Sequence, residues 1–314
     1  MFQFPQINNQ YLYTANYSKD EESLCKLEIK CIFSLILEGK HFISPTYIDP
    51  SRSPFIKKCI SIMYRGNTLK DIINQILSDE LLCDKYKVTY INLQEEELGF
   101  HQRRNIEREI GLNILGEYEL DDPKINFGIT KLKETWIFGE LESNNSQWLS
   151  HNKKPFSYSN ALKVNVSRAV VNIAVGTNTN YKVIDPCCGI GTVLIEALSM
   201  GIHIIGYEIN PSIGYNAIRN LNYFGYENII TIGDMTTIED TFDIAIIDLP
   251  YGIFTQITAQ EQLAIILSGR RIAKKLILIT FEDMETEIKA SGFKIQDRCT
   301  ISKGNFIRHI SICI

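Results

Sequence analysis

The chain has 314 residues, a formal net charge of -5, and 45% hydrophobic and 22% charged residues. This length favours two domains with sizeable cores, and the composition is ordinary for a globular protein. No apolar run approaches the roughly 18 residues that cross a membrane, and the first residues lack a signal-peptide pattern. We therefore expect a cytoplasmic protein with no membrane partner. The acidic balance argues against a general nucleic-acid coat but permits a local basic face.

Cysteine usage points to a reducing compartment. The cysteines form no CxxC pair, so the spacings support no zinc site, and a disulfide framework is not expected at this length. We expect free thiols and no metal. The eight cysteines are Cys25, Cys31, Cys59, Cys83, Cys187, Cys188, Cys299 and Cys313.

Strand-like and helix-like segments mix in the front half, which predicts an α+β region. The segment 68–80 is predicted as a helix with Thr68 as its N-cap. Strands are predicted at 11–17, 54–64 and 85–93, two further strands around a turn at 124–141, and helices at 22–36 and 105–115.

A polar stretch separates this region from the rest of the chain. LESNNSQWLSHNKKP, residues 141–155, carries Asn and Ser and ends in a proline, a composition typical of a linker. We place the linker at 146–156. This leaves residues 1–145 as the front region and 157–314 as a second domain.

Beyond the linker, strands alternate with helices, which predicts βαβ units and a parallel sheet. Helices are expected at 160–175 and near 259–268. The tail at 293–314 has two strand-like runs joined around SKGN, which indicates an antiparallel hairpin at the sheet edge. The predicted fold class is α/β: a Rossmann-like, mostly parallel sheet preceded by an α+β region.

The first stretch with chemical meaning is DPCCGIGTVLIEA, residues 185–197. Gly189 and Gly191 allow a tight turn between a strand that ends at Asp185 and a helix, whose free N–H groups favour an electronegative group. Leu194 stands where the dinucleotide fingerprint has its third glycine, and there is no phosphate-loop lysine. Taken alone, this turn is also compatible with a sheet that binds no ligand.

Acidic residues end the next two predicted strands. Glu208 lies 23 residues after Asp185, where nucleotide-binding sheets accept hydrogen bonds from ribose hydroxyls. Asp234 can accept an amino hydrogen of an adenine, with Met235 against the ring. The alternatives are that Glu208 caps the helix starting at Pro211 and that the GDM stretch is a plain polar turn. Together with the glycine turn, these residues predict an adenosine-type cofactor.

The fourth stretch is DLPYG, residues 248–252, which follows the buried strand FDIAII. Asp248 and Tyr251 stand at the C-terminal end of this strand, where open α/β sheets bind ligands. A plain turn would be satisfied with Gly, Asn or Asp, so this pair of residues favours a ligand site. The alternative is a strand-ending turn with Tyr251 partly buried.

In this order and spacing, the four stretches resemble the amino-methylating class of S-adenosylmethionine-dependent methyltransferases. The form DPxCGxGTxxIEA together with DLPYG is similar to the THUMP-containing RNA methyltransferases that make N2-methylguanosine in tRNA. In the front half, NIEREIGLNILGEYELDDPKINFGI (105–129) resembles the end of a THUMP domain. The segment 154–174 resembles the one that leads into the catalytic domain and packs over the cofactor.

The resemblance implies a ferredoxin-like plus THUMP RNA-binding region over residues 1–145, S-adenosyl-L-methionine as cofactor, and methylation of the exocyclic N2 amine of a guanosine in tRNA. It leaves open whether an activating protein subunit is needed. The implied cofactor-binding residues are Asp185, Pro186, Cys187, Gly189, Gly191, Thr192, Glu208, Asp234 and Met235, and the implied catalytic residues are Asp248, Leu249, Pro250 and Tyr251.

Leu249 departs from the family pattern, which has proline there. Its backbone carbonyl can still accept a hydrogen bond from an amine, but the rigidity of proline is lost. This departure from the family pattern affects what can be expected of the methylation target and of the rate of methyl transfer.

RNA binding would require a basic face, whose salt dependence would be strong. Each basic residue taken singly is also explained as a solvated surface charge. The candidate positions are Lys57, Lys58, Arg65, Arg103, Arg104, Arg108, Lys153 and Lys154.

Three other functions remain as alternatives. A DNA or rRNA amino-methyltransferase, acting on adenine N6, cytosine N4 or guanine N2, would share the catalytic domain; the THUMP-like front half disfavours a DNA enzyme. A non-catalytic RNA-binding protein is disfavoured because Asp185, Glu208 and Asp248 are all present. A dehydrogenase is disfavoured by the missing third glycine and has no use for DLPYG.

Overall fold

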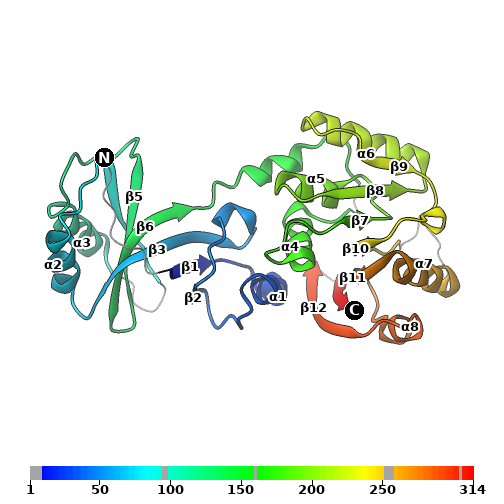
Figure 1. The fold of residues 1–314 in the computed structure, drawn as a ribbon, viewed down its shortest axis with the longest axis horizontal. Helices are drawn as coiled ribbons and strands as arrows, with labels where there is room; N and C mark the ends of the chain where they lie inside the picture. Colours follow the sequence, from blue (N-terminus) through cyan, green and yellow to red (C-terminus); the bar gives the residue numbers. More distant parts are fainter. Residues whose placement is uncertain (1–8, 94–97, 159–160, 251–257, 304–305) are drawn as a thin grey trace. The chain divides into compact units, whose positions relative to one another are not determined.

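The computed structural model describes residues 9–93, 98–158, 161–250, 258–303 and 306–314, which fall into two compact units (Figure 1). Unit 1 contains the described residues up to Asn16 together with Leu37–Asn145, and unit 2 contains Tyr17–Ile36 and Ser146–Ile314. The expected front region of residues 1–145 therefore differs from unit 1 by the segment Tyr17–Ile36.

Unit 1 is a six-stranded sheet in the order β2-β1-β3-β6-β5-β4. All neighbours are antiparallel except β4 and β5, which run parallel. Helices α2 and α3 pack on it over a core of aliphatic and aromatic side chains. The elements are β1 (Tyr11–Ala15), β2 (His41–Ser44), β3 (Ile56–Gly66), α2 (Leu69–Ser78), β4 (Tyr86–Tyr90), α3 (Phe100–Gly111), β5 (Ile125–Leu132) and β6 (Thr135–Ser143), with a 3-10 turn η2 at Pro50–Arg52.

The predicted cap of α2 is confirmed. The Thr68 hydroxyl accepts from the Asp71 N–H at 3.2 Å, and the Asp71 carboxylate accepts from the Thr68 N–H at 2.9 Å. This reciprocal pair satisfies two backbone donors that the helix start leaves open. The predicted helix at 105–115 is shifted instead: α3 begins at Phe100 and ends at Gly111. The short strand β2 carries too few residues to give a strong sequence pattern and was not predicted.

Unit 2 is a seven-stranded sheet in the order β12-β13-β11-β10-β7-β8-β9 (Figure 1). Strands β11, β10, β7, β8 and β9 are parallel, and β13 runs antiparallel between β11 and β12. The predicted parallel sheet with an antiparallel C-terminal hairpin is confirmed. The strands are β7 (Val183–Asp185), β8 (Ile204–Glu208), β9 (Ile230–Ile232), β10 (Phe242–Asp248), β11 (Ala273–Thr280), β12 (Ile295–Lys303) and β13 (Phe306–Cys313).

Helices cover both faces of this sheet, as a doubly wound fold requires. On one face, α4, α5 and α6 pack against the sheet, and on the other α7 and α8 pack over a core that includes Ile184, Ala245 and Ile247. The helices are α4 (Val164–Val175), α5 (Thr192–Ser199), α6 (Pro211–Tyr223), α7 (Ala259–Ile272) and α8 (Glu285–Ala290), with 3-10 turns η3 (Gln147–Lys153) and η4 (Met235–Thr237).

Helix α1 (Glu22–Phe33), preceded by the 3-10 turn η1 (Lys19–Glu21), explains why Tyr17–Ile36 belongs to unit 2. It packs on α4 and β12. Buried Glu28 accepts a hydrogen bond from the buried Asn172 amide at 2.7 Å, and Lys30 pairs with Asp297 at 2.7 Å. Amphipathic spacing alone predicts a helix here, but it does not say which sheet covers the apolar face.

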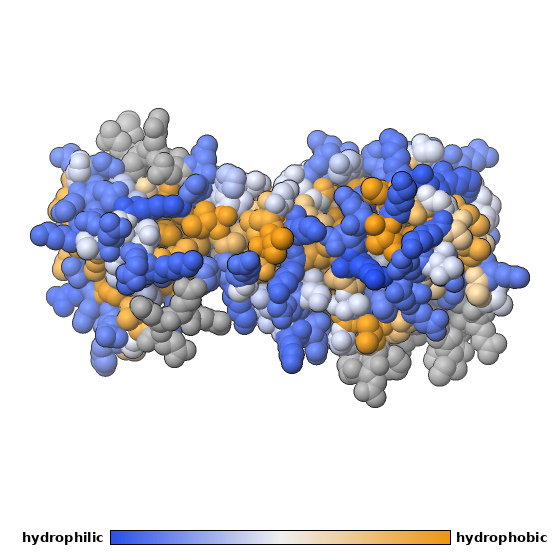
Figure 2. Space-filling view, turned by 90° about the horizontal axis from the view of Figure 1, so that it is seen from below, coloured by the Kyte–Doolittle hydropathy of each residue, from blue (hydrophilic) through white to orange (hydrophobic). Residues whose placement is uncertain are grey.

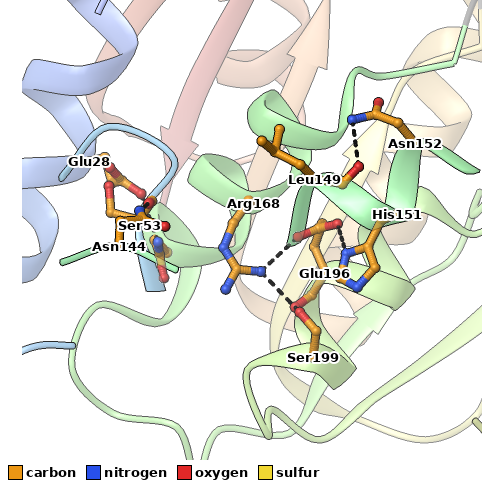
Figure 3. A network of polar contacts seen from close by, with 10 residues as sticks. Glu28, Ser53, Asn144, Leu149, His151, Asn152, Arg168, Glu196 and Ser199 are labelled. Atoms are coloured by element: carbon orange, nitrogen blue, oxygen red, sulfur yellow. Dashed lines mark hydrogen bonds and ion pairs between the residues drawn. The ribbon is translucent and has the colours of Figure 1, made fainter. Parts of the chain in front are cut away.

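The predicted linker at 146–156 contains a packed element. In η3, His151 is buried, and its Nδ1 lies 2.6 Å from Oε1 of Glu196. Arg168 of α4 donates to the other Glu196 oxygen at 2.8 Å and to Ser199 at 3.0 Å, so these side chains converge (Figure 3). We call His151, Arg168, Glu196 and Ser199 the anchor cluster. It fixes η3 to α4 and α5.

Within the described ranges, no helix is both long enough and apolar enough to cross a bilayer. Figure 2 shows a face on which hydrophilic residues predominate, with smaller hydrophobic areas between them. The cytoplasmic location stays a prediction.

Candidate functional site

Three acidic side chains meet on one face of the unit 2 sheet, at the carboxyl ends of neighbouring strands. The β7–β10 register pairs Ile184 with Ala245, and because faces alternate along a strand, Asp185 and Asp248 share the opposite face. Glu208 lies on that same face, two residues beyond the β8 position paired with Asp185. We call Asp185, Glu208 and Asp248 the acidic edge. The sheet order places them on β7, β8 and β10, where open α/β sheets bind ligands.

The glycine turn after β7 lies beside the acidic edge. Gly189 and Gly191 have φ of 53° and 79°, left-handed values that favour glycine. A Cβ at position 189 would lie 2.6 Å from the Tyr158 hydroxyl, so only glycine fits there without a shift. Gly191 caps α5 and carries the turn into the helix, as the sequence predicted.

Glu208 ties the acidic edge to this turn. Its Oε2 accepts from the Gly189 N–H at 2.9 Å and its Oε1 accepts from the Asn210 N–H at 2.9 Å. The α6 cap is Asn210, whose side chain accepts from Ser212 and Ile213. The alternative in which Glu208 caps that helix is therefore wrong. Each carboxylate oxygen keeps a second lone pair, which can receive a ribose hydroxyl.

Burial disfavours the charge on all three carboxylates. Burial raises the pKa of Asp185 well above its usual value, and the nearby charges of Asp248 and Glu208 raise it further. A hydrogen bond from the Cys187 N–H acts in the opposite direction and lowers this pKa. Burial also raises the pKa of Glu208. It raises the pKa of Asp248 to about 7, with Arg308 acting in the opposite direction. A ligand with positive charge would relieve this repulsion.

Asp248 ends β10, as the sequence predicted. Among the described residues, none donates a hydrogen bond to the buried Oδ1 of Asp248. The Leu249 side chain is buried in the core, and its N–H donates to the Ile279 carbonyl at 2.9 Å, a bond that proline cannot make. Compared with proline, leucine at this position lacks the rigid ring but makes one further strand hydrogen bond. Pro250 follows, half-buried, and Tyr251 lies outside the described residues.

Asp234 and Met235 lie where β9 leads into η4. Asp234 accepts from the Thr236 N–H at 2.8 Å, so the polar-turn contact is present. Met235 is buried, with its sulfur 3.8 Å from the Cys187 sulfur, which brings this turn to the glycine turn. Arg271 of α7 holds the turn by donating to the carbonyls of Ile238, Met235 and Thr236. Sequence reasoning missed Arg271, because its partners are backbone atoms about 35 residues away.

A second missed residue holds the segment ahead of α4. Asn220 of α6 is fully buried; its side chain accepts from the Phe156 N–H at 2.9 Å and donates to the carbonyls of Phe156 and Ile190 at 3.0 Å. It thereby clamps the lead-in segment to the glycine turn. This contact places Tyr158 over Gly189.

The residues of this edge suit a nucleoside cofactor with a cationic part. Thr192, at the start of α5, has a buried hydroxyl with no hydrogen-bond partner among the described residues, and Asp248 Oδ1 is in the same condition. Orphaned buried polar atoms are rare and point to a missing ligand or water. Pro186 lies in the same turn, beside Asp185.

The described residues hold no group of three or more His, Cys, Asp or Glu side chains arranged for a metal ion. The expected basic residues are partly engaged elsewhere. Lys57 donates to the Pro54 carbonyl, Arg104 pairs with Glu107, and burial lowers the pKa of Lys58 and of Lys154. The remaining candidates are Arg65, which donates to Gln10, together with Arg103, Arg108 and Lys153.

Comparison with known families gives a match in the same region. Residues 151–265 match the family model described as an RMKL-like methyltransferase domain. A relative in Pyrococcus abyssi, named tRNA (guanine(10)-N2)-dimethyltransferase, is 28% identical over 54% of this chain and 57% of its own length. Relatives of the same name in Methanothermobacter thermautotrophicus and Methanocaldococcus jannaschii are 31% and 25% identical, over 31% and 60% of their lengths. The chain thus spans less than two thirds of each of these relatives.

Among solved structures, TrmN from Thermus thermophilus aligns over 97% of this chain and 99% of its own, at 12% identity and a TM-score of 0.48. A predicted N6-adenine-specific DNA methylase from Listeria monocytogenes aligns over 96% and 95%, at 11% identity and a TM-score of 0.46. The fold assignment rests on the sheet order and strand directions given above.

Proposed function

We propose that the chain transfers a methyl group from S-adenosylmethionine to the N2 amine of a guanosine in tRNA, on the premise that residues 151–265 match a methyltransferase-domain family model. The observation that carries the proposal is the acidic edge: three carboxylates that share one face beside a glycine turn, with Asp185, Glu208 and the Oδ1 atom of Asp248 buried. S-adenosylmethionine, when bound, supplies an electrophilic methyl on a cationic sulfur and leaves as the neutral thioether. Its positive charges suit an edge on which burial disfavours uncompensated negative charge.

The chain divides binding and transfer between two sets of residues. Glu208 receives the ribose hydroxyls, Asp234 the adenine amino group, and Asp185 with the glycine turn the methionine end. Asp248 accepts a hydrogen bond from the target amine, with the Leu249 carbonyl as a second acceptor. Asp248 and the Leu249 carbonyl would hold the amine with its lone pair toward the methyl group, and the Asp248 carboxylate would take up the proton that the amine loses on methylation. Positioning and charge provide most of the rate gain.

Unit 1 is proposed to bind RNA. Its helix α3 carries Arg104 and Arg108 one turn apart, both exposed. The name shared by the curated relatives makes guanosine 10 of tRNA the first position to examine. The ferredoxin-like and THUMP character of residues 1–145, and the need for an activating subunit, are parts of this proposal.

The test is transfer of labelled methyl from S-adenosylmethionine to unmodified tRNA transcripts and, in parallel, to ribosomal RNA and duplex DNA. The modified nucleoside is identified by mass. N2-methylguanosine in tRNA supports the proposal. Label only in DNA or rRNA would keep the methyltransferase and replace its substrate. Cofactor binding without any label would point to a missing subunit or to a protein that binds RNA without catalysis.

A further inference from the structure

One charged residue at the acidic edge has no role in the function proposed above. The β10–β11 register pairs Asp248 with Ile279, and the β11–β13 register pairs Ile279 with Ile310. Residues paired across a sheet share a face, and so do residues two apart on one strand. Arg308, two residues before Ile310, is therefore on the same face as Asp248. The antiparallel direction of β13 places it at the carboxyl edge of the parallel strands.

The Arg308 side chain is held in place at this edge. Its guanidinium lies over the Phe281 ring, 5.1 Å from the ring centre, and Phe281 directly follows β11. Arg308 itself is half-buried. A guanidinium is charged in either setting, but stacking on a ring fixes its direction, which a solvated side chain loses to rotamer freedom. One strand, β11, lies between the strands of Arg308 and Asp248, so the two strands are about 10 Å apart at the usual strand spacing, which a long side chain can span in large part.

The charges around Asp248 explain what such a cation would do. The charge of Asp248 acts on both Asp185 and the Cys187 thiol, so its carboxylate lies close to these groups. Burial disfavours the ionised Asp248 carboxylate, and the field of Arg308 favours it. Among the described groups, Arg308 is the cation whose field acts on Asp248.

We propose that Arg308 is a positioning residue for methyl transfer, which holds the Asp248 carboxylate in the charged form that receives the proton of the target amine. This inference rests on the proposed function, because it assigns Asp248 the acceptor role. Arg308 does not touch the reacting atoms; it acts through Asp248 from β13, on the same face of the sheet.

The test compares Arg308→Gln with Arg308→Lys and with the matched control Arg298→Gln. Arg298 lies on β12 of the same hairpin but pairs with Asp283 and Glu285 of unit 2. The first measurement is the carbon-13 titration of the Asp248 carboxyl in the ligand-free protein, assigned with Asp248→Asn. The second is the pH profile of methyl transfer to tRNA.

In Arg308→Gln the Asp248 titration and the acidic limb of the rate profile should both move up by about one pH unit, roughly a tenfold loss of rate at low pH that recovers as pH rises. Arg308→Lys should restore most of the shift, and Arg298→Gln should leave both curves unchanged. An Asp248 titration that does not move in Arg308→Gln overturns the inference, whatever the activity. If the Asp248 titration moves in Arg308→Gln but the wild-type protein transfers no methyl group, the pairing of Arg308 with Asp248 is supported and the proposed function is overturned instead.

Discussion

Unit 2 contains two groups of charged side chains, which differ in whether their carboxylates have hydrogen-bond and ion-pair partners. In the anchor cluster, both oxygens of the fully buried Glu196 meet a partner, His151 on one side and Arg168 on the other. At the acidic edge, the carboxylates repel one another, and Asp248 Oδ1 accepts no hydrogen bond from the described residues. Helix α5 connects the two regions: it begins at the glycine turn and carries Glu196 in its second turn.

The difference separates structural from functional charge. A buried ion that is paired and hydrogen-bonded holds its elements together, and removing one partner leaves an uncompensated charge. A buried carboxylate without a cation costs stability until a ligand provides one, which is what a site prepared for a cationic cofactor requires. The following predictions test whether the two groups behave so differently.

The largest effect is expected at Asp248. Asp248→Ala should lower kcat for methyl transfer by about 10²–10⁴-fold, because it removes the acceptor of the amine proton. Affinity for the cofactor, measured by calorimetry, should stay within about threefold of wild type. Wild-type turnover in this variant would show that the catalytic carboxylate lies elsewhere.

The anchor cluster should respond in stability. Glu196→Gln leaves Arg168 buried without a counter-charge and should lower the free energy of unfolding by about 3–5 kcal/mol, measured by urea denaturation. The matched control is Glu285→Gln, which breaks the exposed pair with Lys289 and should leave the midpoint unchanged. Equal midpoints for the two variants would remove the structural role given to the cluster.

Asp185→Asn should show the opposite sign at the acidic edge. The new amide keeps an oxygen for the Cys187 N–H but drops the charge, so the ligand-free protein should be about 1 kcal/mol more stable at pH 8, while the Kd for S-adenosylmethionine rises roughly 10–100-fold. Glu208→Gln provides the contrast, because one amide oxygen cannot replace two acceptors. This variant should lower both the stability of the ligand-free protein and its affinity for S-adenosylmethionine. A destabilised Asp185→Asn protein would contradict this account.

The pH dependence follows from the same shifts. The folded pKa values of Asp185, Glu208 and Asp248 are raised, so their contribution to stability is fully present below the unfolded value of about 4. It is lost as pH rises through the folded value, about 7 for Asp248. Thermal unfolding of the ligand-free protein from pH 4 to pH 8 should therefore show a decline that is smaller in Asp185→Asn. Saturating cofactor should flatten it.

Arg271 should have a smaller, localised effect. Arg271→Met releases three carbonyls of the turn that carries Asp234 and Met235, and should raise the Kd of the cofactor by about tenfold, the worth of one to two hydrogen bonds, with kcat at saturation unchanged. Arg270→Met is the control, since Arg270 stacks on Phe293 at 4.9 Å. A fall in kcat at saturating cofactor would mean that Arg271 serves more than the turn.

The smallest change concerns the departure from the family motif. Leu249→Pro removes the N–H donated to Ile279 and part of a buried side chain, and should cost about 1–3 kcal/mol without increasing transfer. Leu249→Met keeps the N–H and the apolar volume and should be nearly neutral. Faster transfer by Leu249→Pro would show that the missing rigidity limits the enzyme.

Much of the acidic edge could be predicted from local patterns. Glycines between a strand and a helix, an acidic residue 23 positions on, and a carboxylate after the fourth strand of the domain each leave a signal in a short window of sequence. Their side chains come together because the carboxyl ends of parallel strands lie at one edge. The role of Tyr251 stays a prediction, and so do the cofactor contacts of Glu208 and Asp234.

The residues that support the site left no such signal. Arg271, Asn220 and Arg308 act on atoms far away in sequence, often backbone carbonyls, whose position depends on how strands and helices pack.

By itself, the sequence determined the alternation of strands and helices, the antiparallel tail and the three carboxylates, because hydrophobic periodicity and turn chemistry are local properties. Only the tertiary structure decided that α1 joins unit 2 and that η3 is packed through His151. It likewise decided that the Leu249 N–H makes a strand hydrogen bond that proline could not, and that Arg308 shares a face of the sheet with Asp248. Each of these depends on which surfaces meet, which no single stretch of the chain can specify.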